Sequence, residues 1–300
     1  MFAVTILGNN SALPMHDRHP TAQVVTLDEH MFLVDCGEGT QIQMNRYKIR
    51  RSRIEYIFIS HLHGDHYFGL AGLLNSYGLN GRTEDLWLFA PAQLQEILEL
   101  QFRVSDTILP YKIHFRALEN EGLLVDEKKL TVSCFKVTHR IPTWGFLFRE
   151  KEKPKKLVPE KLREYSIPAS FYHHLKEGSN YTMRDGTVIM NEWVTQPANP
   201  RRSYAYCADT IFDESISEKI FGSDLVYHEA TYLDDLKERA ASRFHSTSRQ
   251  AATIALKAHA KKLLIGHFSS KYEALDDFLT EASSVFQNVE LAMEGVTYTI

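Results

Sequence analysis

Four side chains of metal-ligand type lie within one six-residue segment. The segment His61-Leu62-His63-Gly64-Asp65-His66 comes directly after an apolar, β-rich run at residues 54–60. Imidazole nitrogens and a carboxylate suit Zn²⁺, and a turn at the glycine can aim all four side chains at one point. Two ligand pairs this close together indicate two neighbouring metal ions. The alternative is a set of polar residues on an exposed loop, which the position at the end of a strand disfavours.

Three more candidate ligands also follow apolar runs. His139 follows residues 130–138, which alternate as a strand does, Asp209 follows residues 204–208, and His267 follows residues 263–266. Because strand ends line the ligand crevice of an α/β sheet, these side chains can converge there. Any one of them alone is more often structural, but three in succession favour a shared site.

Two further segments carry groups suited to proton transfer. His228-Glu229-Ala230-Thr231 follows a strand at residues 224–227, and His245-Ser246-Thr247 opens a helix that begins near Ser246. A glutamate that orients a histidine forms a plausible acid–base pair. The alternative is that His245 is only a neighbour of the helix cap.

The surrounding pattern predicts an α/β fold in which strands and helices alternate. The apolar runs at residues 23–26 and 31–35, separated by four polar residues, predict a hairpin. Further strands are predicted at residues 1–8, 54–60, 86–90, 203–208, 223–228 and 262–266, and helices at 41–47, 70–77, 91–101 and 246–260. Residues 150–200 are charged and rich in proline, which indicates an insertion between two α/β halves.

The composition excludes several classes of protein. In 300 residues, 44% are hydrophobic and 24% are charged, as in globular proteins and unlike disordered or fibrous chains. No apolar stretch approaches the roughly 18 residues of a membrane span, and the first residues resemble a strand rather than a signal peptide. Three distant cysteines provide neither a disulfide framework nor a thiolate zinc site. We therefore expect a soluble, cytoplasmic protein.

Charge is distributed unevenly along the chain. The net charge of −4 does not favour a nucleic-acid binder. Locally, however, residues 46–53 carry five arginines or lysines, and residues 149–163 carry seven against three glutamates. Either cluster, taken alone, is more often a solvated face than a track for phosphate groups.

The ligand pattern, His61-x-His63-x-Asp65-His66 with His139, Asp209 and His267, resembles that of the metallo-β-lactamase superfamily. A narrower resemblance, to the ribonuclease Z family of tRNA 3′-processing endoribonucleases, rests on additional blocks in the expected order. These blocks are Gly37-Glu38-Gly39-Thr40-Gln41, Ser60–His66, Ala208-Asp209-Thr210, His228-Glu229-Ala230-Thr231 and His245-Ser246-Thr247. They cover nearly the whole chain.

The resemblance implies an αββα sandwich of two similar halves, a single metallo-β-lactamase-like domain over residues 1–300. His61, His63 and His139 would hold one zinc ion, Asp65, His66 and His267 a second, and Asp209 would bridge them. Asp65 matches the position of the family's active-site base. His245, supported by Glu229, would protonate the leaving 3′ oxygen. The expected products are a tRNA with a 3′-hydroxyl and a trailer with a 5′-phosphate. Position 63 is His where the diiron flavoproteins of the superfamily carry Glu, which disfavours a redox site.

The resemblance also assigns residues 150–200 as an inserted arm that binds tRNA, and it implies a homodimer. The basic residues at the start of this arm are the substrate-binding candidates: Arg149, Lys151, Lys153, Lys155 and Lys156. The segment Ile167-Pro168-Ala169-Ser170-Phe171 lacks the Gly-Pro pair usual in the family's arm. The loop at residues 14–19 departs from the family's usual Lys and Asn.

The leading prediction is thus a zinc-dependent endonuclease that removes 3′ trailers from precursor tRNA. The alternative is a small-molecule hydrolase with the same fold, acting on a cyclic nucleotide, another phosphodiester or a thioester. The presence of residues 150–200 disfavours it. A catalytically inactive RNA-binding homologue is disfavoured because all seven expected ligands are present.

Overall fold

The computed structural model describes residues 1–300, which divide into two compact units. The first unit comprises residues 1–126, 132–148 and 202–300, and the second comprises residues 127–131 and 149–201. None of the helices combines the length and the hydropathy needed to cross a membrane.

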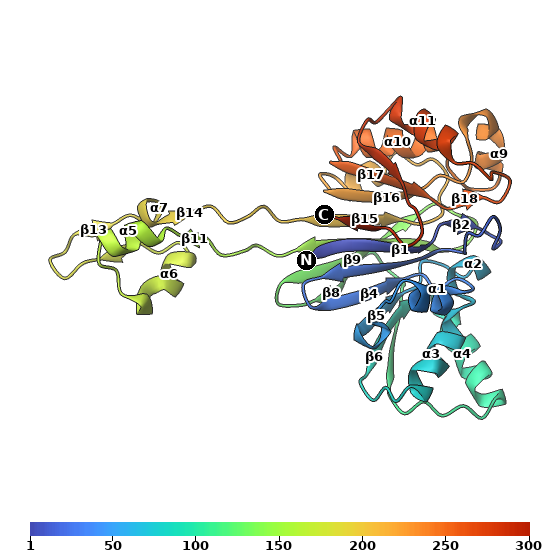
Figure 1. Cartoon of the computed structure of the whole chain (residues 1–300), viewed down its shortest axis with the longest axis horizontal. Helices are drawn as coiled ribbons and strands as arrows, with labels where there is room; N and C mark the ends of the chain where they lie inside the picture. Colours follow the sequence, from blue (N-terminus) through green and yellow to red (C-terminus); the bar gives the residue numbers. More distant parts are fainter. The chain divides into compact units, whose positions relative to one another are not determined.

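The first unit is built on two seven-stranded sheets (Figure 1). In spatial order, the first sheet consists of β20 (Thr297–Thr299), β1 (Phe2–Gly8), β3 (Ala22–Leu27), β4 (His30–Val34), β5 (Ile54–Phe58), β6 (Leu86–Ala90) and β7 (Ile113–Ala117). The second consists of β19 (Val289–Leu291), β17 (Lys262–Gly266), β16 (Leu225–Glu229), β15 (Ser203–Cys207), β10 (Thr143–Glu150), β9 (Leu130–Val137) and β8 (Gly122–Asp126). Two short strands, β2 (Asn10–Ser11) and β18 (Phe268–Ser269), pair in parallel beside them.

Each sheet contains a run of parallel strands. β4 to β7 are parallel in the first sheet, and β15, β16, β17 and β19 are parallel in the second. Strands β3 and β4 form the antiparallel hairpin that the sequence predicts, with Val25 opposite Phe32. Because parallel strands end at a common edge, the loops after β5, β15, β16 and β17 can meet there.

Aromatic side chains pack the inner faces of the two sheets against each other. Phe58 on β5 is fully buried, with ring centroids 5.0 Å from Phe89, 5.1 Å from Phe146 and 5.7 Å from Phe148. The last two belong to β10 in the opposite sheet. Strand β10 was not predicted, although residues 144–148 form a continuous run without polar side chains, as expected of a strand buried on both faces.

Helices cover the outer face of each sheet, as Figure 1 shows. The first sheet packs against α1 (Thr40–Arg46), α3 (Leu70–Leu79) and α4 (Gln93–Val104). The second packs against α8 (Ile216–Lys219), α10 (Ser248–Lys257) and α11 (Asp276–Ser283). Two further short helices are α2 (Gly64–Tyr67) and α9 (Lys237–Ser242). The predicted αββα layering is therefore present, and the predicted helices all form within a few residues of their expected bounds.

The second unit contains short elements around a small core of its own. They are β11 (Lys156–Leu157), α5 (Pro159–Glu164), α6 (Tyr172–Lys176), β12 (Tyr181–Thr182), β13 (Val188–Ile189), α7 (Asn191–Val194) and β14 (Thr195–Gln196). Leu162, Ile167, Leu175, Ile189 and Val194 form the buried cluster between them.

The aromatic packing between the sheets predicts that Phe58→Ala lowers the free energy of unfolding by about 3–5 kcal/mol, because it leaves a cavity among three other rings. Urea denaturation followed by circular dichroism measures this loss. Phe221→Ala is the matched control, since Phe221 is 60% exposed, and a change within about 0.5 kcal/mol is expected there. A loss below 1 kcal/mol for Phe58→Ala would contradict the packing described.

Candidate metal centre

The seven predicted ligands all lie together at one end of the first unit. His61, His63, His139 and Asp209 form one group, and Asp65, His66 and His267 form a second. Within each group, every pair of candidate ligand atoms lies within 4.8 Å. Asp209 also forms a third group with His245 and His267, so it lies beside candidate ligands of both other groups.

Local structure explains how the four candidate ligands of residues 61–66 come together. β5 ends at Phe58, and residues 59–63 form a loop before the four-residue helix α2. His61 and His63 belong to the loop, whereas Asp65 and His66 lie on the helix, which turns them back toward the same point. The amide of Cys36 donates to the carbonyl of His66 over 2.8 Å, which anchors this turn to the segment after β4.

Four of the five histidines are oriented by a hydrogen bond at Nδ1. His66 Nδ1 lies 2.8 Å from Asp35 Oδ2, His139 Nδ1 lies 2.8 Å from the carbonyl oxygen of Phe244, and His267 Nδ1 lies 2.9 Å from Thr231 Oγ1. His61 Nδ1 lies 3.0 Å from Ser60 Oγ. A partner at Nδ1 leaves Nε2 free as a metal ligand and fixes the direction of the ring.

Asp209 lies between the two groups of candidate ligands. Its Oδ1 atom lies 3.3 Å from Nε2 of both His66 and His267, and its Oδ2 atom lies 3.7 Å from His61 Nε2 and 4.0 Å from His139 Nε2. Asp209 is 2% exposed, and Oδ1 has no hydrogen-bond partner although it is buried. A buried carboxylate oxygen without a donor is costly. A cation between these groups would satisfy it, so the residues present fit metal ions.

The charges around the cluster lead to the same conclusion. Burial holds the pKa of His61 well below its ordinary value, and burial together with His139 lowers that of His63 to about 4. These imidazoles are therefore neutral, as metal ligands must be. Burial also disfavours the charged form of His66, but Asp209, Asp65 and Asp35 outweigh it and raise the pKa of His66. Here a bound cation would replace the proton.

The predicted acid–base residues also lie in this site. His245 Nδ1 is 2.9 Å from Glu229 Oε1 and 3.9 Å from Asp209 Oδ2. Glu229 is fully buried and accepts hydrogen bonds from the backbone amides of Thr210, Thr231 and Ser246. His245 lies two residues before Thr247, the N-cap of α10, where Thr247 and Gln250 form a reciprocal capping box.

The five basic candidates lie in the second compact unit. Three of their side chains have polar partners within it: Lys153 with Glu150, Lys155 with Asn191, and Lys156 with Asn199. Arg149 is exposed, and Lys151 is partly buried. The seven candidate metal ligands, by contrast, belong to the first unit.

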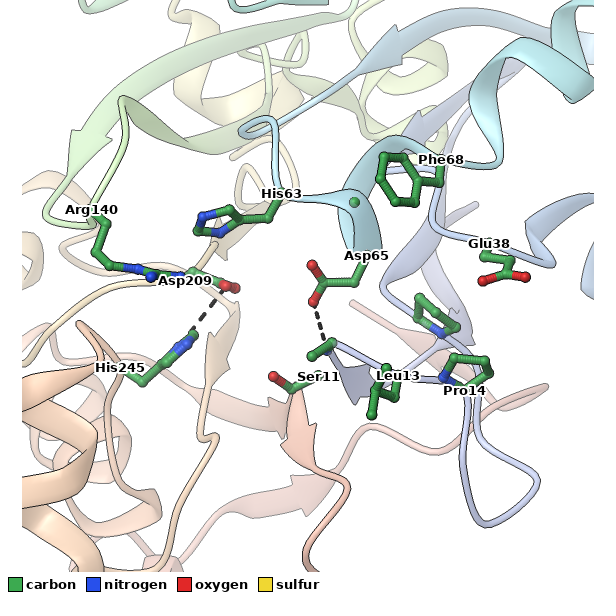
Figure 2. A pocket seen from close by; sticks show the side chains of 13 residues that line it. Ser11, Leu13, Pro14, Glu38, His63, Asp65, Phe68, Arg140, Asp209 and His245 are labelled. Atoms are coloured by element: carbon green, nitrogen blue, oxygen red, sulfur yellow. Dashed lines mark hydrogen bonds and ion pairs between the residues drawn. The ribbon is translucent and has the colours of Figure 1, made fainter.

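A pocket of about 440 Å³ opens over the cluster (Figure 2). The lining of this pocket includes four of the predicted site residues, His63, Asp65, Asp209 and His245. Sequence reasoning missed Arg140, Phe68, Leu13 and Pro14, which also line it. Their closeness in the chain to His139 and Asp65 was the available signal for the first two.

Sequence reasoning also missed Asp35, the fully buried partner of His66. It accepts further hydrogen bonds from the Ser60 amide (2.7 Å), the Ser60 hydroxyl (2.8 Å) and the Tyr206 hydroxyl (2.6 Å). Its position at the end of β4 was a signal of the same kind that identified Asp209.

Comparison with known proteins places the chain in a family. Residues 2–153 match a family described as "Anti-Pycsar protein Apyc1". This range contains residues 61–66 and His139 but not Asp209, Glu229, His245 or His267. Over its whole length, the chain is 42% identical to ribonuclease Z of Bacteroides fragilis, with 99% of that relative covered.

Solved structures agree with this relationship. Human tRNase Z, short form, superimposes with a TM-score of 0.72 at 27% identity, covering 99% of both chains. The metallo-β-lactamase fold protein YhfI of Bacillus subtilis superimposes with a TM-score of 0.70 at 18% identity, covering 99% of both chains. These matches confirm the predicted metallo-β-lactamase fold. With its full-length identity to ribonuclease Z of Bacteroides fragilis, the chain belongs to the ribonuclease Z family.

Proposed function

We propose that this chain is a two-zinc endoribonuclease that cuts precursor tRNA and releases the 3′ trailer. The reaction is hydrolysis of one phosphodiester bond, leaving a 3′-hydroxyl on the tRNA and a 5′-phosphate on the trailer. The observation that carries this proposal is the buried Asp209 carboxylate, which faces two groups of imidazoles at the floor of an open pocket.

Three ligands are assigned to each metal ion, with Asp209 shared between the two. His61, His63 and His139 would hold the first zinc ion, and Asp65, His66 and His267 the second. When bound, two zinc ions lower the pKa of a water molecule and neutralise charge on the scissile phosphate.

Asp65 is proposed as the base that orients the attacking water and accepts its proton. Burial disfavours the charged form of Asp65, but the imidazoles of His66 and His267 outweigh burial and lower its pKa. The carboxylate is therefore ionised at neutral pH and able to accept a hydrogen bond. Its Oδ2 atom is held by the amide of Ala12, 2.8 Å away.

His245 is proposed as the acid that protonates the leaving oxygen. As water attacks phosphorus, the bond from phosphorus to the 3′ oxygen breaks, and a proton from His245 completes the new 3′-hydroxyl. Burial alone would lower the pKa of His245, but Glu229 and Asp209 raise it to about 9. With Nδ1 bound to Glu229, the second ring nitrogen is left to donate.

The second unit is proposed as the tRNA-binding arm, covering residues 150–200. Its support is the excess of basic residues at its start, including Arg149, Lys151, Lys153, Lys155 and Lys156, together with its place in the chain between His139 and Asp209. Contacts between such residues and RNA phosphates weaken steeply as salt is added.

We further propose that the protein forms a homodimer and that it is located in the cytoplasm. Large apolar side chains are exposed near the C-terminal ends of α3 and α4, with Leu79 81% exposed, Val104 74% and Ile108 88%. Exposed apolar surface of this kind suits an interface between proteins. All three cysteines are free and buried, which fits a reducing compartment.

The function is tested with a precursor tRNA that carries a 3′ trailer. We expect a single cut beside the discriminator nucleotide, lost when a chelator removes the metal and restored by Zn²⁺. Mapping both new ends distinguishes a 3′-hydroxyl from a 3′-phosphate. An intact precursor after incubation with fully zinc-loaded protein would contradict the proposal. Zinc-dependent hydrolysis of small phosphodiesters alone would retain the metal site and exclude tRNA as the substrate.

The role of His245 predicts a loss that depends on the leaving group. His245→Asn can still bind Glu229 but cannot donate a proton as an acid, so kcat on precursor tRNA should fall roughly 100-fold or more. Hydrolysis of bis(p-nitrophenyl) phosphate should fall much less, because nitrophenolate leaves without being protonated. His259→Asn is the control, since His259 is exposed and asparagine tolerates its positive φ of 51°. Equal losses on both substrates would argue against the acid role.

The contacts of Asp35 predict a loss of metal affinity when its charge is removed. Asp35→Asn should weaken zinc binding by about 10–100-fold. In the native protein the Asp35 carboxylate orients the His66 ring and raises the basicity of that ring, and the variant loses both effects. Competition with a chromogenic chelator measures the affinity. Asp224→Asn is the matched control, an aspartate that accepts from the Ser203 amide over 2.7 Å at the start of β16. Unchanged zinc affinity in Asp35→Asn would show that His66 needs no such partner.

A further inference from the structure

The pocket over the metal cluster has two chemically different ends. Figure 2 shows Arg140 and His245 at one end and Phe68, Leu13 and Pro14 at the other, with His63 and Asp65 between them. The first end carries the only guanidinium or ammonium group in the lining, that of Arg140. The second end is mostly apolar, although Glu38 also lies there.

Phe68 presents an aromatic ring to the apolar end. It follows α2 directly, and 66% of its surface is exposed, which is high for a phenylalanine. Its ring lies over Gly64, where an added Cβ atom would be only 2.2 Å from a ring carbon. The absence of a side chain at position 64 therefore allows the ring to lie against the turn that carries the metal ligands.

The facing lip of the pocket is fixed to the metal site. Leu13 is 53% exposed and precedes Pro14, and the side-chain amide of Asn10 donates to the carbonyl of Leu13. One residue earlier, Ala12 has a φ of 63° and its amide donates to Asp65 Oδ2. A non-glycine residue held in this conformation is a local strain of the kind that often accompanies function.

The charges decide what this end can accept. A phosphate group would be repelled by the carboxylate of Glu38 and would find no cation among Leu13, Pro14 and Phe68. A nucleobase suits the same surroundings, because its face stacks on an aromatic ring. Its amino groups can also donate to a carboxylate.

We propose that Phe68 and the Leu13–Pro14 lip form a subsite for the nucleobase of the first trailer nucleotide. The inference rests on the proposed function. His245 donates to the 3′ oxygen, which belongs to the tRNA side of the cut, so the tRNA-side nucleotide lies at the end with Arg140 and His245. The nucleotide on the other side of the scissile phosphate then lies at the end with Phe68. Because a trailer is single-stranded beside the cut, its first base is free to leave its neighbours and stack there.

Removing the ring should weaken the reaction with precursor tRNA. We expect Phe68→Ala to lower kcat/KM roughly 10-fold, the range found when a stacking aromatic is truncated, and Phe68→Trp to retain activity. Zinc content per chain should not change in either variant. Phe221→Ala removes an exposed phenylalanine outside the pocket and should leave kcat/KM unchanged.

A double-mutant cycle with the substrate identifies the stacked base. Wild-type protein and Phe68→Ala are compared on a precursor tRNA that is abasic at the first trailer nucleotide, and on one that is abasic at the discriminator nucleotide. With the trailer base absent, Phe68→Ala should cause no further loss, whereas with the discriminator base absent it should still cause the full loss.

Two results would overturn the inference while leaving the proposed function intact. In the first, Phe68→Ala lowers cleavage by the same factor whether or not the first trailer base is present. In the second, the effect of Phe68→Ala disappears when the discriminator base is absent instead of the trailer base. Failure of the wild-type protein to cut any precursor would overturn the proposed function and this subsite with it. The three results are distinguishable because cleavage of the unmodified precursor by the wild-type protein is measured first.

Discussion

A single buried carboxylate, Asp35, connects the two sheets at the edge where the metal ligands meet. It accepts hydrogen bonds from Ser60 and His66, in the loop and helix that follow β5 of the first sheet, and from the Tyr206 hydroxyl on β15 of the second. A fully buried carboxylate is tolerated only when such donors are present, so the two sheets must end in a fixed register beside it. The position of His66 relative to Asp209, which follows β15, depends on that register.

The site also concentrates negative charge that the protein alone does not neutralise. Asp35, Asp209 and Glu229 are almost fully buried, and His66 and His245 lie between them. Among the ion pairs of the structure, none of the three is paired with a lysine or arginine. The cluster's own potential cations are its histidines, and burial lowers the pKa of three of them, His61, His63 and His139, so that they are neutral. Metal ions would supply the missing positive charge, which explains why the ligand cluster can be buried at all.

That the candidate ligands lie together could be predicted from the sequence because their signals are local. His61 to His66 form one continuous motif, and Asp209 and His267 each follow an apolar run that became a parallel strand. Asp35 carries the same kind of signal, because it directly follows β4, but its role was missed because it depends on distant partners such as Tyr206, 171 residues away in the chain. Strand β20 was missed for a similar reason: it is three residues long and is stabilised by pairing with β1 at the opposite end of the sequence. Non-local pairing leaves little trace in a short segment.

The two ends of the pocket differ in how they are encoded. Metal ligands are recognised by residue type, because few side chains can bind a metal ion. Phe68, by contrast, stands beside the motif as one more phenylalanine, and in sequence it cannot be distinguished from Phe58, which is fully buried. Only its exposure separates them, and exposure depends on the tight turn at Gly64 and on where α2 ends. The reaction can therefore be inferred from side-chain chemistry, whereas the choice of substrate depends on surfaces that only the folded backbone creates.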